Sequence, residues 1–476
     1  MERYSDKYSK ILADLNAEIW DYSELKFEEF KSSLSLQKVL KEQGFKIESG
    51  VAEMETAFTA SAGEGSPVIG ILAEFDALSG MSQKAGTAEP VPREETPNGH
   101  GCGHCLLGTA AVGAALLIRD YLKENNKKGT VVLIGCPAEE GGSGKAYLAR
   151  AGVFDNLDAA LTWHPAGGNA VITGSFQANC QAYFRFKGIS SHAAASPHLG
   201  RSALDAVELM NVGVNYMREH IEPTDRIHYA VTDTGGISPN VVQNHAEVIY
   251  LIRSVNTEKV KKLYERVCKT AQGAALMTET QVEIVFDKAC SNVISNSILE
   301  DVLYKSMKEI SLPEYTEEEI KFAKAIKNTI TDTDINSDLS LLGVRGMKKK
   351  ELVERYKAGV MSDFVVEHQH QEIDIPGSSD VGDCSHTVPT AQFTGGCFVP
   401  GTPAHSWQMV SQGKEGTAVK GMLYAAEVLA KAAEKLIENP EILKAAKDEF
   451  IAATDGEKYS CPIPPEVKPN MNGKKN

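Results

Sequence analysis

The sequence predicts an α/β fold that is interrupted by a second domain of ferredoxin-like α+β order. Strand-like apolar runs that end in polar loops alternate with helical segments, which is typical of an α/β sheet. Between residues 181 and 288 the order changes to β-α-β-β-α-β, the split arrangement of ferredoxin-like units. Apolar content of 42% and charged content of 24% suit a folded globular chain of this kind.

The α/β part rests on five segments with clear patterns. Helical spacing and a terminal glycine predict a helix over residues 27–44, and a second, buried helix is predicted over 105–124. The expected strands, each running into a polar loop, are residues 66–78, 129–140 and 157–165.

The ferredoxin-like part contains six predicted elements. Its strands are expected at residues 181–188, 226–234, 246–254 and 281–288, and its helices at 202–219 and 257–277. A unit of roughly 110 residues is large enough to fold as its own domain.

These elements divide the chain into a catalytic domain in two parts, 1–178 and 291–460, an inserted domain, 179–290, and a tail, 461–476. The second catalytic part includes a charged stretch, 312–376, which we interpret as a helical insertion, and an amphipathic helix over 421–438.

Charge and composition exclude several functions. The formal net charge of −15 argues against binding to nucleic acid or an anionic membrane. The charged N-terminus lacks the apolar core of a secretory signal, and no apolar run reaches the ~18 residues that span a bilayer. The nine cysteines form no disulfide pattern, so we expect a reducing, cytoplasmic location.

The first functional signal is the position of polar residues at strand ends. Asp76, Glu139, Glu140 and His164 are each predicted just past a strand. Because ligands of α/β sheets collect at the carboxyl ends of strands, these side chains are expected at one edge.

The stretch Gly-His-Gly-Cys-Gly-His-Cys at residues 99–105 allows two interpretations. Cys102 and Cys105 have the C-x-x-C spacing of thiol oxidoreductases, whereas Cys102 and His104 could begin a metal site. A proline- and glutamate-rich loop precedes the motif where a thioredoxin-like protein would have a strand, and the glycines permit a tight path that turns both side chains inward. Both observations favour the metal.

Further candidate ligands follow along the chain. In an extended backbone the neighbouring Glu139 and Glu140 point opposite ways, so that one can bind metal while the other activates water. The nitrogen, oxygen and sulfur donors of the whole set could hold two borderline divalent ions such as Zn²⁺ or Mn²⁺. The set is Cys102, His104, Glu140, His164 and His405.

Together these motifs resemble those of the M20 family of metallo-aminoacylases and carboxypeptidases, in its amidohydrolase branch. The resemblance spans nearly the whole chain and rests on AEFDALSG, NGHGCGHCLLGTAA, GCPAEEGGSGK, DAALTWHP, FKGISSHAAASPHLGRSALDA, GGISPNVVQ, SSDVGDCS and GTPAHSWQMVSQGKEG, among other segments. It implies a catalytic domain of zinc-peptidase type, with a mixed sheet flanked by helices, and an inserted lid and dimerisation domain.

The resemblance also implies a role for each site residue. Cys102 would bridge two metal ions, with His104 and His164 on one and Glu140 and His405 on the other. Glu139 would be the general base, and His192 would stabilise the oxyanion, in related enzymes that of the partner protomer. Asn240 and Arg253 would hold the substrate carboxylate, and Asp76 would orient a ligand histidine.

The activity implied is hydrolysis of the amide bond of an N-acyl amino acid, with p-aminobenzoyl-glutamate, which yields p-aminobenzoate and glutamate, as the leading candidate. A dipeptidase or another N-acyl-amino-acid hydrolase would use the same catalytic residues. A C-x-x-C oxidoreductase and a non-catalytic, metal-binding component of a larger enzyme are the alternatives from other classes. A homodimer through the inserted domain is expected, and a hetero-oligomer with a homologous chain of a second type is the further option.

One position departs from the family pattern. Relatives have Asp or Asn where this chain has Cys105, directly after His104. A thiol is a weak hydrogen-bonding group, so a polar partner of the metal ligands would be lost there.

Overall fold

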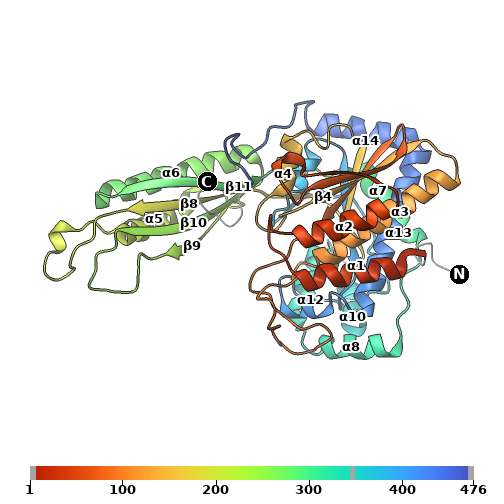
Figure 1. Ribbon diagram of the computed structural model, residues 1–476, viewed down its shortest axis with the longest axis horizontal. Helices are drawn as coiled ribbons and strands as arrows, with labels where there is room; N and C mark the ends of the chain where they lie inside the picture. Colours follow the sequence, from red (N-terminus) through yellow and green to blue (C-terminus); the bar gives the residue numbers. More distant parts are fainter. Residues whose placement is uncertain (1–6, 343–348, 470–476) are drawn as a thin grey trace. The chain divides into compact units, whose positions relative to one another are not determined.

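The computed structural model describes residues 7–342 and 349–469 of the 476-residue chain. The described residues divide into two compact units. The first contains the residues up to 174 together with 294–375 and 383–460. The second contains 175–293, 376–382 and the tail from Cys461. Each unit builds its own sheet (Figure 1).

The first unit is built on a seven-stranded mixed sheet of order β1-β2-β4-β3-β5-β13-β6. Strand β3 pairs in parallel with β4 and β5, and β5 pairs in parallel with β13, whereas the outer strands are antiparallel. The α/β class with a mixed sheet is therefore confirmed. The strands are β1 (Lys46–Ser49), β2 (Phe58–Glu64), β3 (Val68–Glu74), β4 (Gly129–Cys136), β5 (Ala159–Ala166), β6 (Ala170–Ile172) and β13 (Thr390–Gly396).

The four central strands all end at the same edge of this sheet. Their parallel register pairs Glu74 of β3 with Cys136 of β4, and His164 of β5 with Thr394 of β13. The loops that follow these strands therefore emerge side by side, and this edge carries the candidate site.

The core of the first unit lies between this sheet and its helices. The central helix α3 (His104–Glu124) packs against β3, β4 and β5 and against α13 (Gly416–Glu438) (Figure 1). Gly108 allows the close approach, because a β-carbon there would lie 2.5 Å from the carbonyl oxygen of Glu74. Four further helices complete this part of the unit: α1 (Ser9–Tyr22), α2 (Phe30–Glu42), α7 (Ser297–Glu309) and α14 (Pro440–Ala453).

Helix α3 is also the one described helix that is long and apolar enough to cross a membrane. Its apolar window is 89% buried inside the protein, which is the environment of a core helix. Its alanine- and leucine-rich composition is thus explained by packing on all sides.

The charged stretch 312–376 is helical only in its first two-thirds. It forms α8 (Glu317–Lys327), α9 (Asp332–Leu341) and α10 (Lys349–Ala358), and residues 343–348 lie outside the described part. From Gly359 to Ile373 the chain has no helix, so the prediction of a helical insertion was wrong there. Bridge pairing of Val365 with Asn169 shows the reason, because this segment runs extended beside the chain around β6.

The second unit has the predicted β-α-β-β-α-β order. Its antiparallel sheet has the order β11-β8-β10-β9, with α5 and α6 packed against each other and on the sheet. The elements are β8 (Ala178–Lys187), α5 (Ala203–Met217), β9 (Arg226–Asp233), β10 (His245–Ser254), α6 (Thr257–Thr278) and β11 (Gln281–Cys290). The short elements of the chain are α4 (Gly144–Arg150), β7 (Ser175–Phe176), β12 (Asp374–Ile375), α11 (Val381–Ser385) and α12 (Trp407–Gln412).

Candidate metal centre

The five predicted metal ligands come together at the carboxyl edge of the first unit's sheet. Cys102 and His104 stand at the start of α3, Glu140 follows β4, and His405 follows β13. His164 was expected just past a strand, but it lies inside β5, two residues before the strand ends. Its donor nitrogen still lies within 4.8 Å of the donor atoms of Cys102 and His104.

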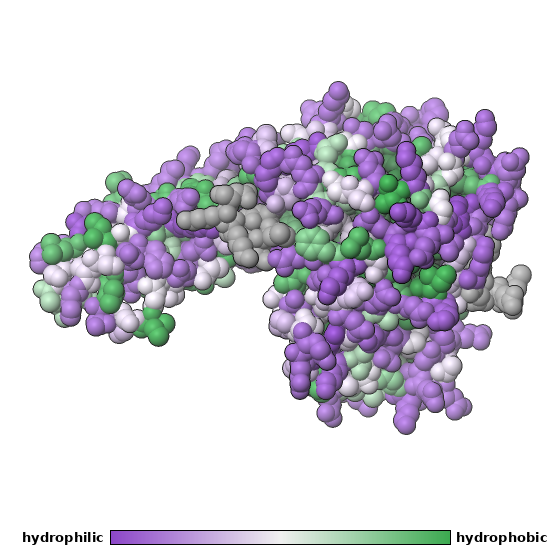
Figure 2. Space-filling model, viewed as in Figure 1, coloured by the Kyte–Doolittle hydropathy of each residue, from purple (hydrophilic) through white to green (hydrophobic). Residues whose placement is uncertain are grey.

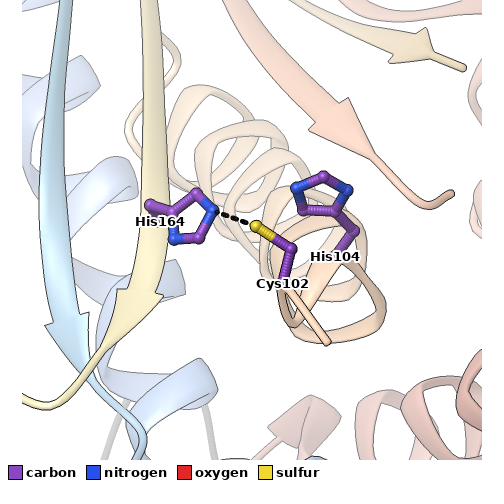
Figure 3. Close-up of side chains that lie close together, drawn as sticks. All are labelled: Cys102, His104 and His164. Atoms are coloured by element: carbon purple, nitrogen blue, oxygen red, sulfur yellow. Dashed lines mark hydrogen bonds between the residues drawn. The ribbon is translucent and has the colours of Figure 1, made fainter. Parts of the chain in front are cut away.

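Cys102 and the two histidines form the first group of donors. The Cys102 Sγ atom lies 3.2 Å from His164 Nε2, and the rings of His104 and His164 are 5.7 Å apart, edge to face (Figure 3). One donor atom from each of the three residues lies within 4.8 Å of the other two. Such spacing suits three ligands of one ion, since metal–sulfur and metal–nitrogen bonds are about 2.0–2.3 Å long.

Both histidines are fixed in the tautomer that a metal requires. His104 Nδ1–H donates to Asp76 Oδ1 at 2.9 Å, and His164 Nδ1–H donates to the carbonyl oxygen of Pro165 at 2.9 Å. In the neutral form of each ring, the Nε2 atom therefore carries the lone pair that a metal would bind. Burial lowers the pKa of His164 to about 4, with the neighbouring His104 adding to the effect, so this ring is neutral.

Glu140 and His405 form a second group around the same thiol. Donor atoms of Cys102, Glu140 and His405 lie within 4.8 Å of one another, and His405 Nε2 is 3.5 Å from Glu140 Oε1. Burial opposes charge on Glu140, but the contact with His405 and the nearby charge of His104 together outweigh burial and lower the carboxyl pKa to about 2. Cys102 belongs to both groups, which is the position of a bridging ligand.

Glu139 points to different neighbours from Glu140. Its carboxylate lies within 4.8 Å of donor atoms of His104 and Glu74, whereas Glu140 faces Cys102 and His405. Two adjacent carboxylates thus approach the cluster from different directions. This arrangement allows one of them to bind a metal ion and the other to accept a proton.

The environment of the two cysteines favours metal binding over disulfide chemistry. Burial, and next the Glu140 carboxylate, raise the pKa of the Cys102 thiol well above its ordinary value, so a thiolate there needs a cation beside it. Cys105 is fully buried in the hydrophobic core, and burial raises its pKa to about 12. Both are free thiols, and Cys105 is not a reactive partner for Cys102.

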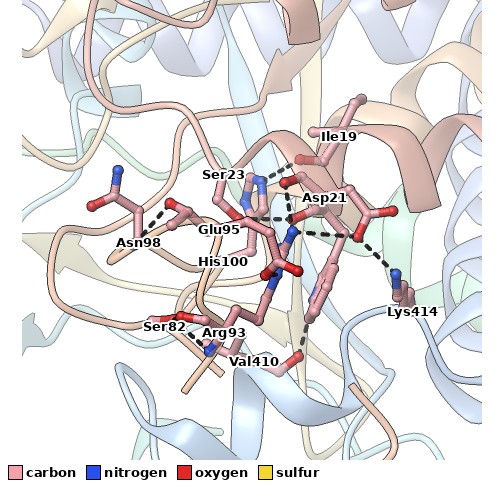
Figure 4. Close-up of polar contacts among 12 residues, drawn as sticks. Ile19, Asp21, Ser23, Ser82, Arg93, Glu95, Asn98, His100, Val410 and Lys414 are labelled. Carbon is pink, nitrogen blue, oxygen red and sulfur yellow. Dashed lines mark hydrogen bonds and ion pairs between the residues drawn. The ribbon is translucent and has the colours of Figure 1, made fainter. Parts of the chain in front are cut away.

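The loop that leads into this cluster is tied to α1 and α12. His100 Nε2–H donates to the carbonyl oxygen of Ile19 at 3.0 Å (Figure 4). The Arg93 guanidinium lies over the ring of Trp20, 4.8 Å from its centre. Trp20 Nε1–H in turn donates to the carbonyl oxygen of Val410 at 2.9 Å. These contacts hold the backbone path that presents Cys102.

The other predicted site residues belong to the second unit. His192 is exposed, and its Nδ1 atom accepts hydrogen bonds from the backbone of Ala194 and Ala195 at 3.2 and 3.1 Å. A neutral ring held in this way carries its proton on Nε2, where it can be donated to an oxyanion. The carbonyl oxygen of Asn240 accepts from the N–H of Ala193 at 3.0 Å, which places Asn240 beside His192.

Arg253 lies on β10 of the second unit. Its guanidinium donates to Ser378 Oγ at 2.8 Å. Burial lowers the pKa of Arg253 from its ordinary value. A partly desolvated guanidinium binds a carboxylate more strongly than one in free solvent.

Two residues of the centre were missed from the sequence. Glu74 ends β3, and its Oε2 lies 3.2 Å from His104 Nε2. Lys145 is fully buried on α4 and lies 2.6 Å from Glu74 Oε1. The period-2 relation of Glu74 to Asp76 could have revealed the first, since both side chains point to one face of an extended chain. Nothing in the sequence distinguishes Lys145 from a surface lysine.

The donor set fits a divalent metal. Within the described part of the chain, His104 Nε2 is buried without a hydrogen bond and lies 3.2 Å from Glu74 Oε2, so a lone pair on this nitrogen needs a proton or a metal ion beside it. Thiolate, imidazole and carboxylate are the ligands of borderline ions such as Zn²⁺ and Mn²⁺. Cys102, His104, His164, Glu140 and His405 would hold them.

A cluster of metal-binding side chains at the carboxyl edge of an α/β sheet is typical of a metallohydrolase. A family model described as peptidase family M20/M25/M40 matches residues 70–435. The chain therefore belongs to this family and is a metallo-amidohydrolase, which confirms the resemblance in the motifs.

Individual relatives agree with this assignment. The chain is 47% identical to the B-type subunit of p-aminobenzoyl-glutamate hydrolase of Escherichia coli (strain K12), over 96% of this chain and 95% of that protein. It is 29% identical to the Xaa-Arg dipeptidase of Mus musculus over 66% of this chain and 72% of that protein.

Among solved structures, the fold matches an aminobenzoyl-glutamate utilization protein from Klebsiella pneumoniae, with a TM-score of 0.58 and 16% identity. The match covers 91% of this chain and 97% of that one. A dinuclear metal binding peptidase of the M20 family from Bacillus subtilis matches with a TM-score of 0.54 and 19% identity, covering 91% of this chain and 99% of the other.

Proposed function

We propose that the chain hydrolyses p-aminobenzoyl-glutamate to p-aminobenzoate and glutamate. The observation that carries the substrate is the 47% identity, over nearly the full length of both chains, to one of the chains of a hydrolase of that compound. A negatively charged chain needs local positive groups to bind an anionic substrate, and the partly desolvated Arg253 is one.

The chemistry of the site residues supports amide hydrolysis. Two divalent ions, Zn²⁺ or Mn²⁺, would supply Lewis-acid activation of water and of the amide carbonyl when bound. Glu139 takes the proton of the attacking water and returns it to the departing amine nitrogen. His192 donates its Nε2–H to the developing oxyanion, and Asn240 and Arg253 hold the substrate carboxylate.

The general-base role is tested with Glu139→Gln in metal-loaded protein. We expect p-aminobenzoate release to fall by about 10²–10⁴-fold while the metal content stays at the wild-type level. Glu140→Gln is the matched variant, with the same change one residue along the chain, and should lose metal as well as activity. Near-full activity of a folded, metal-loaded Glu139→Gln protein would show that another group is the base.

A dipeptidase is the second candidate function. The 29% identity to an Xaa-Arg dipeptidase favours it, and every catalytic residue would be shared. A screen of p-aminobenzoyl-glutamate against N-acyl amino acids and dipeptides, with and without chelator, separates the two. The highest chelator-sensitive kcat/KM identifies the substrate class, and elemental analysis of the same samples identifies the metal.

The second unit has the features of a homodimer interface. Its strand β9 is a sheet edge with exposed Tyr229 and Val231, and edge strands pair readily with another chain. Helix α5 exposes Leu209, Val212 and Tyr216, and Figure 2 shows hydrophobic side chains on the surface of this unit. Light scattering of the purified chain should give twice its mass of 51.5 kDa.

The proposal also covers assembly with a second type of subunit and the cellular location of the chain. The A-type subunit of the Escherichia coli hydrolase is 28% identical over 49% of this chain and 56% of that protein, so a hetero-oligomer with such a homologue is the alternative assembly. Co-expression with an A-type homologue would reveal it as a complex of two different chains. Cell fractionation should recover the chain in the cytoplasm.

A further inference from the structure

The backbone that carries Glu139 and Glu140 is held on both sides by buried acidic side chains. Glu29 Oε1 accepts the N–H of Ala138 at 2.9 Å, and Asp76 Oδ2 accepts the N–H of Glu140 at 2.9 Å. Both acids are almost fully buried, with 0% and 1% of their surfaces exposed. The residue between the two bonds is Glu139.

The conformation at Ala138 needs such support. Its φ angle is +61°, in the left-handed region that residues with a β-carbon seldom adopt. The N–H of Gly142 donates to the carbonyl oxygen of Ala138 at 2.8 Å and closes the turn from the other end. A backbone in this region persists where surrounding contacts determine it, and the bond from Ala138 to Glu29 is one of them.

Glu29 is itself a fixed group. It stands directly before α2, and its backbone carbonyl accepts the N–H of Ser33 at 2.9 Å. Its second carboxylate oxygen accepts from Thr56 Oγ1 at 3.0 Å, and Thr56 is 1% exposed. A side chain with both oxygens hydrogen-bonded and no access to solvent has little freedom to move, so it holds the backbone at Ala138 in place.

The residues around Glu29 reach the same loops. All of these residues belong to the segment 24–29. Lys26 Nζ donates to the carbonyl oxygen of Gly141 at 2.7 Å, and a β-carbon on Gly142 would lie 2.5 Å from the ring of Phe27. The carbonyl oxygen of Glu24 accepts the N–H of Ala77, next to Asp76, at 2.8 Å. One short segment is therefore tied to both loops that meet at His104.

We propose that Glu29 is a positioning residue for the reaction. Through its hydrogen bond with the N–H of Ala138, it sets the direction of the Glu139 carboxylate and the position of the Glu140 backbone. Glu29 is more than a hundred residues from Ala138 along the chain and is not one of the candidate metal ligands. The catalytic half of this inference rests on the proposed function, whereas the effect on Glu140 concerns metal binding alone.

Three variants test the proposal in the full-length, metal-loaded protein. Glu29→Gln keeps an amide oxygen for the Ala138 N–H, and its NH₂ group can donate to Thr56. Glu29→Met has similar length but accepts no hydrogen bond. Thr56→Val removes only the bond to the other oxygen of Glu29 and serves as the control for general loss of stability. Circular dichroism and melting temperature establish that each variant is folded.

The expected result separates positioning from stability. Glu29→Met should lower kcat for p-aminobenzoyl-glutamate about 10- to 100-fold, with KM within about threefold. It should also weaken binding of one metal ion about tenfold and change the visible spectrum of the cobalt(II)-loaded protein. Glu29→Gln should restore each quantity to within about threefold. Thr56→Val keeps the bond from Ala138 to Glu29, so it should lower stability and change kcat by less than about threefold.

Two outcomes would overturn the proposal. One is a folded Glu29→Met protein with wild-type kcat, metal affinity and cobalt spectrum. The other is a Thr56→Val protein that loses activity as Glu29→Met does, because the effect would then follow stability. Where Glu29→Met does not fold, Lys26→Met, which removes the bond to Gly141 near the surface, should lower kcat several-fold, and an unchanged kcat would count against the proposal. If the wild type does not cleave the substrate, the metal affinities and cobalt spectra still decide the matter.

Discussion

Asp76 holds His104 and Glu140 at the same time: Oδ1 lies 2.9 Å from His104 Nδ1, and Oδ2 accepts the backbone N–H of Glu140 at 2.9 Å. A carboxylate can accept both bonds, whereas an asparagine has one oxygen and must leave one donor unpaired.

We therefore expect Asp76→Asn to weaken metal binding about 10- to 100-fold, as the loss of a carboxylate that orients a ligand histidine does. Competition with a chelator of known affinity measures this. Asp158→Asn is the matched control, because Asp158 accepts the N–H of Val68 at the opposite end of β3. Equal effects of the two substitutions on metal affinity would contradict the assignment.

Cys105 should matter for stability and not for metal content. Its side chain lies in the hydrophobic core, so Cys105→Ser buries a hydroxyl at a cost of about 1–3 kcal/mol. Urea unfolding should show this loss while the metal-to-protein ratio stays at the wild-type value. Cys102→Ser should do the reverse and lose metal. A Cys105→Ser protein that also lost metal would place this thiol among the partners of the ligands.

The buried pair of Lys145 and Glu74 should be costly to break. With 0% and 4% of the two side chains exposed, Lys145→Met leaves Glu74 uncompensated, and we expect a loss of about 3–5 kcal/mol in unfolding free energy. The exposed pair of Lys10 and Asp14 on α1 is the control, where Lys10→Met should cost less than about 1 kcal/mol. Similar losses of unfolding free energy for the two lysine variants would show that the buried pair contributes no more to stability than the exposed pair.

The unfolding free energy should depend on pH through Asp338. Burial raises the pKa of this carboxyl to about 6, against the smaller effect of its bond from the Gly401 N–H. Between about pH 4 and pH 6 the folded chain holds a proton that the unfolded chain has released, so stability falls as pH rises through this window.

Because part of Asp338 reaches solvent, we expect a decrease of at most about 2 kcal/mol. Denaturant unfolding across this range measures it. Asp338→Asn should flatten the profile, whereas Asp332→Asn, an exposed acid of the same helix, should leave it unchanged. Parallel profiles for wild type and Asp338→Asn would show that this group is not the source.

Mixed dimers test whether His192 acts on the partner's centre. Glu139→Gln and His192→Ala are each expected to be inactive as homodimers. If His192 reaches across, a mixed dimer has one site with both residues intact, and equal mixing should restore about a quarter of wild-type activity. If His192 serves its own chain, every site in the mixture lacks one residue and no activity returns.

The sequence was informative where side chains alternate or repeat regularly, as in β3, β4, β10 and the helices α3 and α13. It was silent for β13, whose residues TAQFTGG show no strand pattern although the strand lies inside the sheet. Its glycines are explained by tertiary packing, because a β-carbon on Gly395 would lie 3.0 Å from the Trp163 ring. Such a contact cannot be read from local spacing.

The site residues likewise fall into those that local sequence patterns reveal and those that only tertiary contacts explain. Ligand types and spacing suggested Cys102 and His104 together with the histidines from distant loops, because metal chemistry restricts the donors. Cys105 was placed with them by adjacency, yet one residue further along a helix means about 100° of rotation, which turns its side chain into the core. Glu29 is a buried acid far from every motif, and its contact with Ala138 exists only in the fold.

The backbone N–H of His405 donates to the carbonyl oxygen of Gly101 at 2.9 Å, next to Cys102. The loop that carries His405 is thus hydrogen-bonded to the loop that carries Cys102, the thiol shared by the two groups of ligands. A change in the position of one loop therefore affects the other. A metal ion bound by one group of ligands would order the loop that supplies the other group, so the second ion would bind with a smaller loss of entropy. Loading of the centre should therefore be cooperative. A metal titration should show few protein molecules with a single ion.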